Sequence, residues 1–490
     1  MTRDFDRVVL VVVRTVTTLT RLLDILSLIS PDRRLQLVFT YDAEHPAHLG
    51  DGVDAALRRL NVRTISWEEA TKTAFDLALA ASENDRLAEL DAPTLLFPHG
   101  IGYQKYYPGG RVTSGMDPEK LLDPLGEVVP AAIALSHAVQ REQLRAACPE
   151  AAGHAVVVGD PCYDRMSLST HRVRRYREAL GTGTRKLVVV ASTFGKRSLY
   201  GGEPELPQRL LGALPYDEFQ VALVLHPGVT AAHSEFSVHG WETDAMNAGL
   251  VVIPPDRGWQ ATILAADCVI SDAGSSALYA AAVDKPLLIA TSGAMTTVAG
   301  SPLAMLIDAV PSLGEDLREQ IVSVMRHHRS GVHRPIVERA VESPGQSASL
   351  LRELIYGQLA LEPPAPRTYP PVLSPEPPDG RVAAFVAGIL DCELVRFPAS
   401  VPSPRLEFSH VVAHADDAEL HQLDGADVVF TDSRERLSEL LAHWPLARLA
   451  VAPSARGCLV RGRDGSEFEL DGDDPMRLAS EAYLSVVRRP

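Results

Sequence analysis

The chain has 490 residues, of which 46% are hydrophobic and 22% are charged, and its formal net charge is −16 at pH 7. A chain of this length forms about three domains, and the composition is ordinary for a soluble globular protein. The acidic balance argues against a protein whose main task is to bind nucleic acid or an anionic membrane surface. We therefore expect no nucleic-acid partner, and membrane contact that is peripheral at most.

Five cysteines are scattered through the chain without a CxxC motif. This pattern is typical of free thiols in a reducing compartment, and it argues against a disulfide framework or a zinc site. The first residues lack the basic and then apolar pattern of a signal peptide, and no apolar run approaches the ~20 residues that a membrane span requires. We expect a cytoplasmic protein.

The first third of the chain alternates short apolar strands with helical segments. Uninterrupted apolar strands separated by helices predict a parallel sheet that is covered on both faces. We assign this first doubly wound, Rossmann-like domain to residues 1–168, as the acceptor-side domain. Its expected strands are 7–13, 35–40, 62–66, 94–97, 131–136 and 155–158, and its expected helices include 17–29, 67–90 and 138–147.

A second alternating unit follows a basic helix expected over 171–180. Its length and pattern predict another Rossmann-like domain, over residues 169–360, that faces the first and binds the donor nucleotide. Ligands of such sheets bind outside the carboxyl ends of the strands, so the residues that follow each strand are the candidates for a functional site. The expected strands are 186–191, 219–225, 250–253, 268–270 and 286–290.

Eight of the eighteen residues in 361–378 are proline, which predicts a stiff, extended linker. The remaining residues, 379–490, are predicted to form a separate small α/β domain, to which the sequence assigns no role. Its expected elements are strands at 382–387, 410–414, 426–431 and 449–452, a hairpin over 458–470 and a closing helix over 474–487.

A phosphate-binding site is predicted where strand 268–270 passes into a helix. Small hydroxyl and glycine residues follow the strand, so backbone N–H groups and the positive end of the helix dipole can meet a phosphate. An ordinary strand-to-helix turn with a serine N-cap would have the same sequence appearance. The candidate donor-binding residues here are Ser271, Asp272, Gly274, Ser275 and Ser276.

His99 follows strand 94–97 and is itself followed by Gly100 and Gly102, which leave little side-chain bulk to cover it. Imidazole is well suited to accept a proton from a hydroxyl near neutral pH, so His99 is a candidate catalytic base. Lys105, a little further along, can reach a phosphate as a point charge. The alternative is a glycine-rich loop with a half-exposed histidine.

Two further strand ends carry candidate residues. His226 follows strand 219–225, where its imidazole can donate to a diphosphate oxygen, and a structural histidine is the alternative. Thr193 and Arg197 follow strand 186–191 and suit a phosphate or acceptor contact, although an exposed basic loop would look the same. We expect neither a metal nor a cofactor, because the helix dipole and the cations can neutralise the donor's charge.

The turn at 158–165 is interpreted as the crossover between the two domains rather than as part of the site. Gly159 and Pro161 favour a turn, and Asp164 is expected to cap the helix that follows.

The order of these motifs resembles that of the CDP-glycerol glycerophosphotransferases, the teichoic-acid polymerases and primases, which have a GT-B fold. The resemblance covers residues 94–290, less than half of the chain. It implies that His99 is the general base and His226 a phosphate ligand, in a pathway of cell-surface polymer synthesis. It also implies a donor pocket lined by Ser271, Asp272 and Ser275, with Arg197 and Lys105 as supporting charges.

This chain departs from the family's pattern at two places. It has Ala273, Gly274 and Ser275 where the family has an aromatic residue and two serines, and Tyr279 where the family has an acidic residue. Many GT-B sugar transferases and nucleotide-sugar 2-epimerases hold the ribose with a glutamate of the same helix, a role that Leu278 and Tyr279 cannot fill. The identity of the donor therefore stays open.

The leading hypothesis is a transferase that moves a glycerophosphate or glycosyl group from a nucleotide-diphosphate donor to an acceptor hydroxyl. A nucleotide-sugar 2-epimerase or a sugar glycosyltransferase of the same fold is the alternative among enzymes. A non-catalytic nucleotide-binding or scaffold protein is the alternative from another class. The two classes differ in one geometric requirement, because only a transferase must keep His99 facing His226 across a cleft.

Overall fold

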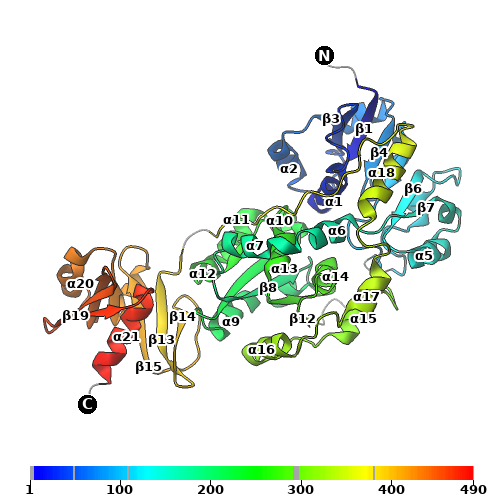
Figure 1. The fold of residues 1–490 in the computed structure, drawn as a ribbon. Helices are drawn as coiled ribbons and strands as arrows, with labels where there is room; N and C mark the ends of the chain where they lie inside the picture. The colour runs from blue at the N-terminus through cyan, green and yellow to red at the C-terminus, as the bar shows by residue number, and fades with distance from the viewer. Residues whose placement is uncertain (1–4, 48–49, 108–109, 291–296, 379–380, 489–490) are drawn as a thin grey trace.

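The computed structural model describes residues 5–47, 50–107, 110–290, 297–378 and 381–488. The described residues form three sheets, and Figure 1 shows their three domains in a row, with the second between the first and the third. The first two sheets are parallel throughout and belong to the two facing doubly wound domains of a GT-B fold. The predicted fold class is confirmed. The predicted domain boundary at residue 379 lies outside the described residues.

The first sheet has the strand order β3-β2-β1-β4-β5-β6-β7. Strand β1, beside the central strand, is mostly valine and leucine, and its residues Val9–Val12 are buried, as expected for a parallel sheet between two layers of helices. The strands are β1 (Arg7–Val12), β2 (Leu35–Tyr41), β3 (Thr64–Ser66), β4 (Leu77–Ala80), β5 (Thr94–Leu96), β6 (Pro130–Leu135) and β7 (Ala155–Val157).

Strand β4 corrects the sequence analysis, which expected one helix over 67–90. The helix α3 ends at Thr71, and Leu77–Ala80 instead pairs with β1 and β5 in the middle of the sheet. Leucine and alanine favour a helix when taken alone. All four residues of β4 are buried, however, and strand pairing inside the sheet decides their conformation.

The helices of the first domain begin with α1, whose N-terminus is closed by a capping box between Thr15 and Thr18. The last of them is α18 (Ser347–Gln358), which the sequence-based range placed with the second domain but which packs in the first domain's core through Leu351, Ile355 and Tyr356. Apart from α18, the helices of the first domain are α1 (Val16–Leu26), α2 (Val53–Leu60), α3 (Trp67–Thr71), η1 (Leu87–Glu89), α4 (Pro118–Leu121), α5 (Val139–Ala147), η2 (Glu150–His154) and α6 (Pro161–Leu168).

The second sheet has the order β10-β9-β8-β11-β12. Its strands are β8 (Lys186–Ser192), β9 (Phe219–Leu225), β10 (Val251–Ile253), β11 (Cys268–Ser271) and β12 (Leu287–Ile289). The helices around it are η3 (Thr170–Arg172), α7 (Val173–Ala179), α8 (Leu199–Gly202), α9 (Leu206–Ala213), α10 (Pro227–His233), α11 (Glu235–Trp241), α12 (Thr243–Asn247), α13 (Trp259–Ala265), α14 (Ser275–Ala282), α15 (Pro302–Ala309), α16 (Leu317–His327) and α17 (Arg334–Ala340).

The third domain has a mixed sheet of order β14-β13-β15-β16-β17-β18-β19, in which β15, β16 and β17 are parallel. Strand β14 was not expected from the sequence. The elements are β13 (Ala384–Leu390), β14 (Glu393–Pro398), β15 (Glu407–His414), α19 (Leu420–Asp424), β16 (Val428–Phe430), η5 (Arg434–Arg436), α20 (Leu437–His443), β17 (Leu449–Pro453), β18 (Gly457–Gly462), β19 (Glu467–Asp471) and α21 (Pro475–Val487).

The third domain is docked on the second domain at the end away from the first (Figure 1). The Arg396 side chain is 2% exposed and pairs with Asp217 of the second domain and Asp474 of the third. Gly212 of α9 lies so close to the carbonyl oxygen of Pro402 that a Cβ atom there would clash with it. The third domain therefore contacts the second through a buried arginine and a close backbone approach.

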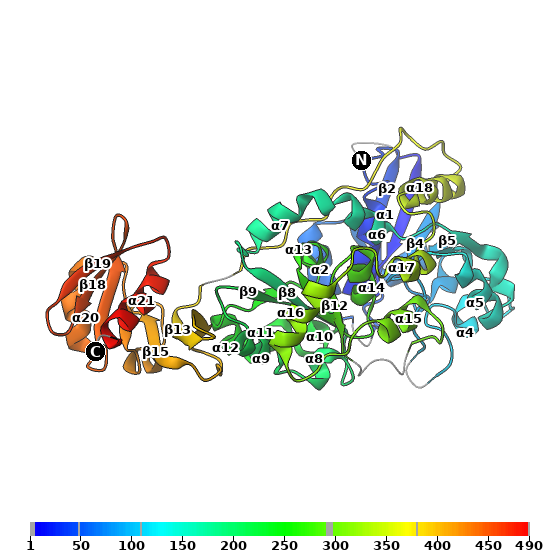
Figure 2. The ribbon, with the colours of Figure 1, turned by 60° about the horizontal axis from the view of Figure 1, so that its bottom comes forward.

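The proline-rich segment, which we call the strap (residues 361–378), is extended as predicted and is also packed along the other domains. Figures 1 and 2 both show it running from α18, past the junction of the first two domains, toward the third. Tyr369 of the strap is buried in the core of the first domain, and Val372 is buried in the core of the second. The strap therefore bridges both doubly wound domains.

Arginine and tyrosine side chains bind the carbonyl groups of the strap. Arg352 of α18 donates to the carbonyls of Pro364 and Ala365, at 2.7 and 3.1 Å, and Tyr176 of α7 donates to that of Val372 at 3.1 Å. Between these contacts, Arg165 of α6 donates to the carbonyls of Pro370 and Pro371. Extended proline-rich backbone makes no internal hydrogen bonds, so its carbonyls are free to accept these donors.

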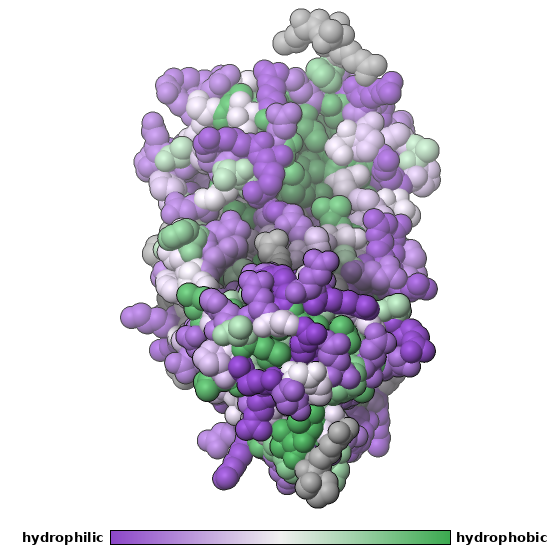
Figure 3. Space-filling view, turned by 90° about the vertical axis from the view of Figure 1, so that its left-hand side faces the viewer, coloured by the Kyte–Doolittle hydropathy of each residue, from purple (hydrophilic) through white to green (hydrophobic). Residues whose placement is uncertain are grey.

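Seen from the end of the third domain, the outer surface is mostly hydrophilic, with hydrophobic residues in small, separated areas (Figure 3). Within the described part of the chain, we find no helix that combines the length and the apolar character needed to span a bilayer.

Removing the Arg352 side chain with Arg352→Met tests whether hydrogen bonding holds the strap in place. Hydrogen bonds to a charged group contribute about 1.5–3 kcal/mol each, so we expect tryptic cleavage after the exposed Arg367 to accelerate at least about 10-fold. Mass spectrometry of timed digests measures cleavage of the bond after Arg367, with Arg339→Met, at an exposed helical position, as the control. Equal cleavage rates in the wild type and Arg352→Met would show that the strap is held by something else.

Candidate functional site

The two parallel sheets turn their carboxyl edges toward each other at the domain boundary. Thr17, just after β1, places its hydroxyl oxygen 3.4 Å from Nε2 of His226, just after β9. In each sheet, the strand order reverses beside the first strand of the domain, between β1 and β4 and between β8 and β11. Such a reversal leaves a crevice at the carboxyl edge, which is where ligands of doubly wound sheets bind.

Helix α14 begins at the crevice of the second sheet with no side chain capping its N-terminus. Gly274 is the N-cap residue, and a Cβ atom there would lie 2.6 Å from Cγ2 of Thr193. Ser275 follows as the first helical residue and is half-buried. Within the described residues, the backbone N–H groups of Ser275 and Ser276 have no acceptor and are open to an anion, which the helix dipole favours.

Asp272 is fully buried behind this helix start. Its carboxylate accepts hydrogen bonds from the Thr193 backbone N–H and hydroxyl, at 2.9 and 2.8 Å, and from the Leu199 N–H at 2.8 Å. These bonds tie the loop after β8 to the loop after β11. Asp272 and Thr193 thus form the support of the predicted donor pocket, and Thr193 directs its hydroxyl at Asp272.

The other residues of the predicted donor set lie at different depths. Ser271 is fully buried, and its hydroxyl donates to the Ala191 carbonyl at 2.9 Å and lies 3.2 Å from the Ser276 hydroxyl. Arg197 is exposed on the loop after β8, beside the exposed Lys196. Within the described residues, neither of these two cations has an ion-pair partner. They are exposed at the edge of the pocket, whereas Ser271 is fully buried and Ser276, like Ser275, is half-buried.

His226 is held in one neutral form by its surroundings. Its Nδ1 accepts the Gly228 N–H at 2.9 Å, because His226 is the N-cap of α10, so the ring proton is on Nε2, which faces the cleft. Burial, followed by the charges of His99 and Lys105, lowers the pKa of His226 to about 3. The Phe194 ring packs on the imidazole with 4.8 Å between centroids. His226 therefore offers a hydrogen-bond donor, not a base, to the cleft.

His99 has the opposite character. Neither of its ring nitrogens bonds to any residue that the structure describes, and the side chain remains accessible to solvent. Desolvation by the nearby protein lowers its pKa, an effect that the Glu83 carboxylate opposes and that the Arg21 and Lys105 charges reinforce. An accessible imidazole that is neutral near pH 7 can accept a proton.

The loop that carries His99 is packed against the second domain. A Cβ atom at Gly100 would lie 3.3 Å from Cβ of Ser275, so the loop touches the first turn of α14 directly. Ile101 is 1% exposed and belongs to the core of the second domain. His99, adjacent to Gly100 in the chain, is consequently held next to the open N-terminus of α14.

Lys105 lies at the end of the same loop, where its backbone pairs with Thr297. Burial lowers the pKa of its ammonium group, and the nearby Asp272 carboxylate opposes this shift. Within the described residues, the Lys105 ammonium has no ion-pair partner. Since its charge also acts on both His99 and His226, it is part of the same cleft.

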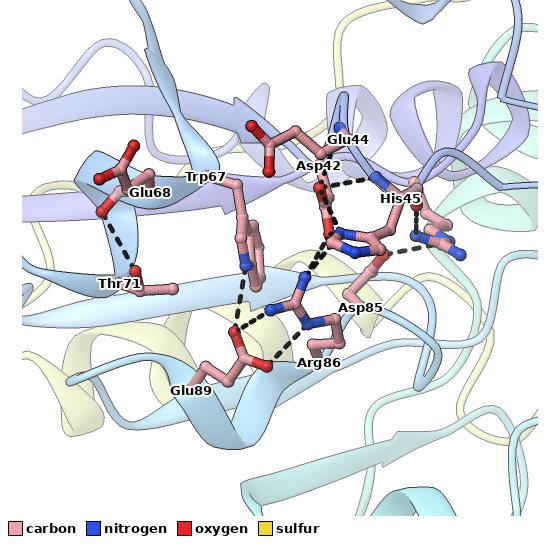
Figure 4. A network of polar contacts seen from close by, with 10 residues as sticks. Asp42, Glu44, His45, Trp67, Glu68, Thr71, Asp85, Arg86 and Glu89 are labelled. Carbon is pink, nitrogen blue, oxygen red and sulfur yellow. Dashed lines mark hydrogen bonds and ion pairs between the residues drawn. The ribbon is translucent and has the colours of Figure 1, made fainter.

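A polar network that the sequence analysis did not single out borders the crevice of the first sheet. Figure 4 shows Asp42, His45, Asp85 and Arg86 converging from the ends of β2 and β4. Arg86 donates to Asp42 at 2.8 Å, and Arg14 lies 3.7 Å from Asp85. Burial raises the pKa of Asp85 well above its ordinary value. This edge is rich in acceptors for hydroxyl groups.

Glu83 connects this network to His99. It follows β4, is nearly buried, and accepts hydrogen bonds from the Tyr107 hydroxyl and, at 2.6 Å, from the Gly115 N–H. Its charge is the largest influence that raises the pKa of His99. Sequence reasoning missed Glu83 because it placed a helix where β4 lies. Recognising β4 would have put both Glu83 and Asp85 at a strand end.

A second group of residues that the sequence did not reveal joins the two domains under the His99 loop. Arg21 of α1 donates from one nitrogen to the Gly100 carbonyl and the Tyr279 hydroxyl, each at 2.7 Å, and to Asp160 at 3.0 Å. Asp160 is also the N-cap of α6. Asp164, which was expected to cap this helix, instead accepts the N–H groups of Gly345 and Ser347.

Among the described residues, no three histidine, cysteine or carboxylate side chains are grouped so that they could hold a metal ion.

No family model matches the chain, and no curated protein matches it by sequence. Solved structures do match. The wall teichoic acid polymerase TagF is 12% identical, with 72% of this chain and 90% of that chain covered and a TM-score of 0.47. The HepE protein of Anabaena, in complex with UDP and glucose, is 14% identical, with coverage of 72% and 100% and a TM-score of 0.42.

The MnaA protein of S. aureus, in complex with UDP, is 12% identical, with coverage of 74% and 100% and a TM-score of 0.42. At these identities the likeness is one of overall chain arrangement. The resemblance inferred from the motif order is to teichoic-acid polymerases, and a protein of that kind is among these structures.

Asp272→Asn tests the supporting role of the buried carboxylate. An amide presents an NH2 group where the carboxylate accepts, which leaves a buried N–H of the β8 loop without a partner at a cost of about 1–3 kcal/mol. We expect the thermal midpoint to fall by several degrees, as measured by scanning calorimetry. Asp244→Asn, at an exposed position, is the control. An unchanged midpoint in Asp272→Asn would contradict the hydrogen bonding described above.

The protonation state of His226 can be read by NMR of ring-labelled histidine, with His226→Gln as the assignment control. With a folded pKa of about 3, the ring should keep the signals of the neutral Nε2–H form down to about pH 5. The unfolded chain, with a histidine pKa near ~6.5, binds this proton first, so the site should lose stability as the pH falls below that value. A titration midpoint of the His226 ring near the ordinary histidine value of about pH 6–7 would contradict this prediction.

Proposed function

We propose that the chain is a GT-B transferase that binds a nucleotide-diphosphate donor in the cleft and passes a glycerophosphate or glycosyl group to an acceptor hydroxyl. The observation that carries the proposal is the contact of Gly100 with Ser275 across the domain boundary. It keeps a free imidazole, His99, beside an uncapped helix N-terminus. A base and an anion site held together in this way suit transfer between a hydroxyl and a phosphate.

The donor's diphosphate is proposed to bind at the first turn of α14. Backbone N–H groups of this turn, Nε2–H of His226 and the Lys105 ammonium would surround its oxygens, with Arg197 at the edge. Asp272 lies close by, but its carboxylate is engaged by three donors from the β8 loop and faces away from the ligand. The charge near the diphosphate is then met by protein groups, and the proposal includes no metal or cofactor.

The acceptor hydroxyl is proposed to approach from the first domain, where His99 removes its proton. The hydroxyl oxygen forms the new bond to the transferred group, phosphorus for a glycerophosphate or the anomeric carbon for a sugar. The bond from that group to the nucleotide phosphate breaks, and its electron pair stays on the leaving phosphate oxygen. His226 and the helix N-terminus stabilise that charge by donating hydrogen bonds that are already in place.

The resemblance to the glycerophosphotransferases makes CDP-glycerol the first donor to test, ahead of UDP- and GDP-sugars. The geometry gives no preference to the non-catalytic alternative. A binding protein has no need to keep an accessible imidazole beside the donor site, and here the charge of His99 is one of the causes that lower the pKa of His226.

His99→Gln separates donor binding from chemistry. Removing a general base lowers transfer by about 10²–10⁴-fold, whereas the groups at α14 that bind the donor are unchanged. A donor at a hundred times its Kd stabilises the fold by about 2.7 kcal/mol, so thermal shifts with CDP-glycerol, UDP-sugars and GDP-sugars measure binding. Transfer is measured by the release of the nucleotide product when the donor that binds is incubated with a panel of hydroxyl acceptors.

His421→Gln, at an exposed position of the third domain, is the matched control for this experiment. We expect one donor to shift the wild type, His421→Gln and His99→Gln alike, and we expect transfer to be lost only in His99→Gln. Full transfer by His99→Gln would remove His99 from the reaction. The absence of a shift with every nucleotide would refute the donor pocket.

A further inference from the structure

Arg21 of α1 is a buried charge at the domain junction, where its side chain is 4% exposed and that of its partner Asp160 is 1% exposed. It is not part of any motif, and the proposed reaction does not use it. Its Nη2 contacts three segments, namely the His99 loop through the Gly100 carbonyl, helix α14 through the Tyr279 hydroxyl, and the start of α6 through Asp160. The two doubly wound domains and the crossover between them thus meet at one nitrogen atom.

We infer that Arg21 is a positioning residue, which sets the placement of His99 relative to the N-terminus of α14 by binding Gly100 and Tyr279 together. The inference rests on the proposed function, in which His99 is the base and α14 binds the donor.

The free-energy cost of burying a charge opposes any movement of the three segments that Arg21 contacts. A guanidinium is expensive to remove from water, and it is tolerated only where hydrogen bonds and an opposite charge compensate it. Asp160 supplies the charge, and the Tyr279 hydroxyl lies 3.2 Å from both Asp160 carboxylate oxygens, so it can accept from Arg21 and donate to Asp160. A shift of α14 or of the His99 loop would break part of this set inside the protein.

Tyr279 occupies the position at which the sequence analysis noted a departure from an acidic residue. The structure assigns its side chain to the domain junction, where it is 2% exposed and packs against Trp259 with 5.5 Å between centroids. A carboxylate at 279 would lie beside Asp160. A phenol can instead link Arg21 to Asp160 without adding a charge.

Apolar contacts independently hold the His99 loop in the same position relative to α14. Ile101 is buried in the second domain's core, whose members include Ala277, Leu278 and Tyr279 of α14. The residue between Ile101 and His99 is Gly100, whose carbonyl Arg21 binds. Any change in how Arg21 is bonded is therefore transmitted to the backbone next to His99.

The charge of Arg21 also acts on His99. The groups that face this imidazole are Glu83 after β4, Lys105 on its own loop, His226 after β9 and Arg21 on α1. Burial is the main cause that lowers the pKa of His99, and Arg21 and Lys105 lower it further while Glu83 raises it. Without the guanidinium, the pKa of His99 should rise, and the acid limb of the activity profile should move to higher pH.

Three variants test the inference. Tyr279→Phe removes one hydroxyl, Arg21→Lys keeps the charge on a shorter side chain that lacks the planar guanidinium, and Arg21→Met removes the charge. The readouts are kcat, the Kd of the donor, and the pKa of His99 from NMR of ring-labelled histidine, with His99→Gln for assignment. Tyr41→Phe and Arg174→Lys, both at accessible sites, are the matched controls.

In Tyr279→Phe we expect kcat to fall about 10-fold or more, the donor Kd to stay within about twofold, and the pKa of His99 to stay unchanged. Arg21→Lys should lower kcat while keeping that pKa. Arg21→Met should raise it. A variant that merely loses stability would instead show a smaller folded fraction with the wild-type pKa and wild-type kcat per folded molecule.

Wild-type kcat in folded Tyr279→Phe, or a loss of donor affinity as large as the loss of kcat, would overturn the inference. If Arg21→Met does not fold, the kcat values of Tyr279→Phe and Arg21→Lys test the inference. If no donor binds to the wild type, it is the proposed function that fails. The titration of His99 in Arg21→Met then still tests the contact, and an unchanged pKa would refute it.

Discussion

The packing of the 99–105 loop into the second domain is the contact on which the rest of the site depends. Ile101 is buried in that domain's core, and Gly100 lies against Ser275 without a side chain between them. A loop that begins at the end of β5 is thereby held by two domains at once. The proposed base and the proposed anion site are brought together by this packing, since His99 follows a strand of the first sheet and α14 follows a strand of the second. Arg21 adds a hydrogen bond across the same boundary to Tyr279, and the strap accepts one from Tyr176 of the second domain.

The two faces of the cleft differ in electrostatic character. On the second domain, the open first turn of α14, the Nε2–H of His226 and the Lys105 ammonium all favour negative charge. The Asp272 carboxylate is turned inward and accepts hydrogen bonds from the β8 loop. On the first domain, Glu83 and the network around Asp85 offer acceptors. A phosphate on one side and a hydroxyl on the other are the groups that such faces can hold.

Much of the fold could be predicted from the sequence, because β-branched runs buried on both faces identify parallel strands, and glycine, serine and histidine mark their carboxyl ends. Strand β4 could not, since Leu77–Ala80 has helical propensity and becomes a strand only through pairing with β1 and β5. Because β4 was not predicted, Glu83 was not recognised as a residue at the end of a strand. Arg21 and Tyr279 were also missed, because a buried pair that is 258 residues apart in sequence carries no local pattern. The inward orientation of Asp272 likewise depends on tertiary contacts.

The most direct test of the account is calorimetric titration of UDP, CDP and GDP into the wild type, Ser275→Ala and Ser275→Asp. A carboxylate in the first turn of α14 interacts favourably with the helix dipole, so the fold keeps its stability while the anion site becomes repulsive. The account predicts that one nucleotide binds to the wild type and to Ser275→Ala, and that Ser275→Asp weakens its binding at least about 10-fold at an unchanged thermal midpoint. Equal affinity in Ser275→Asp would contradict the claim that the donor's phosphates bind at α14.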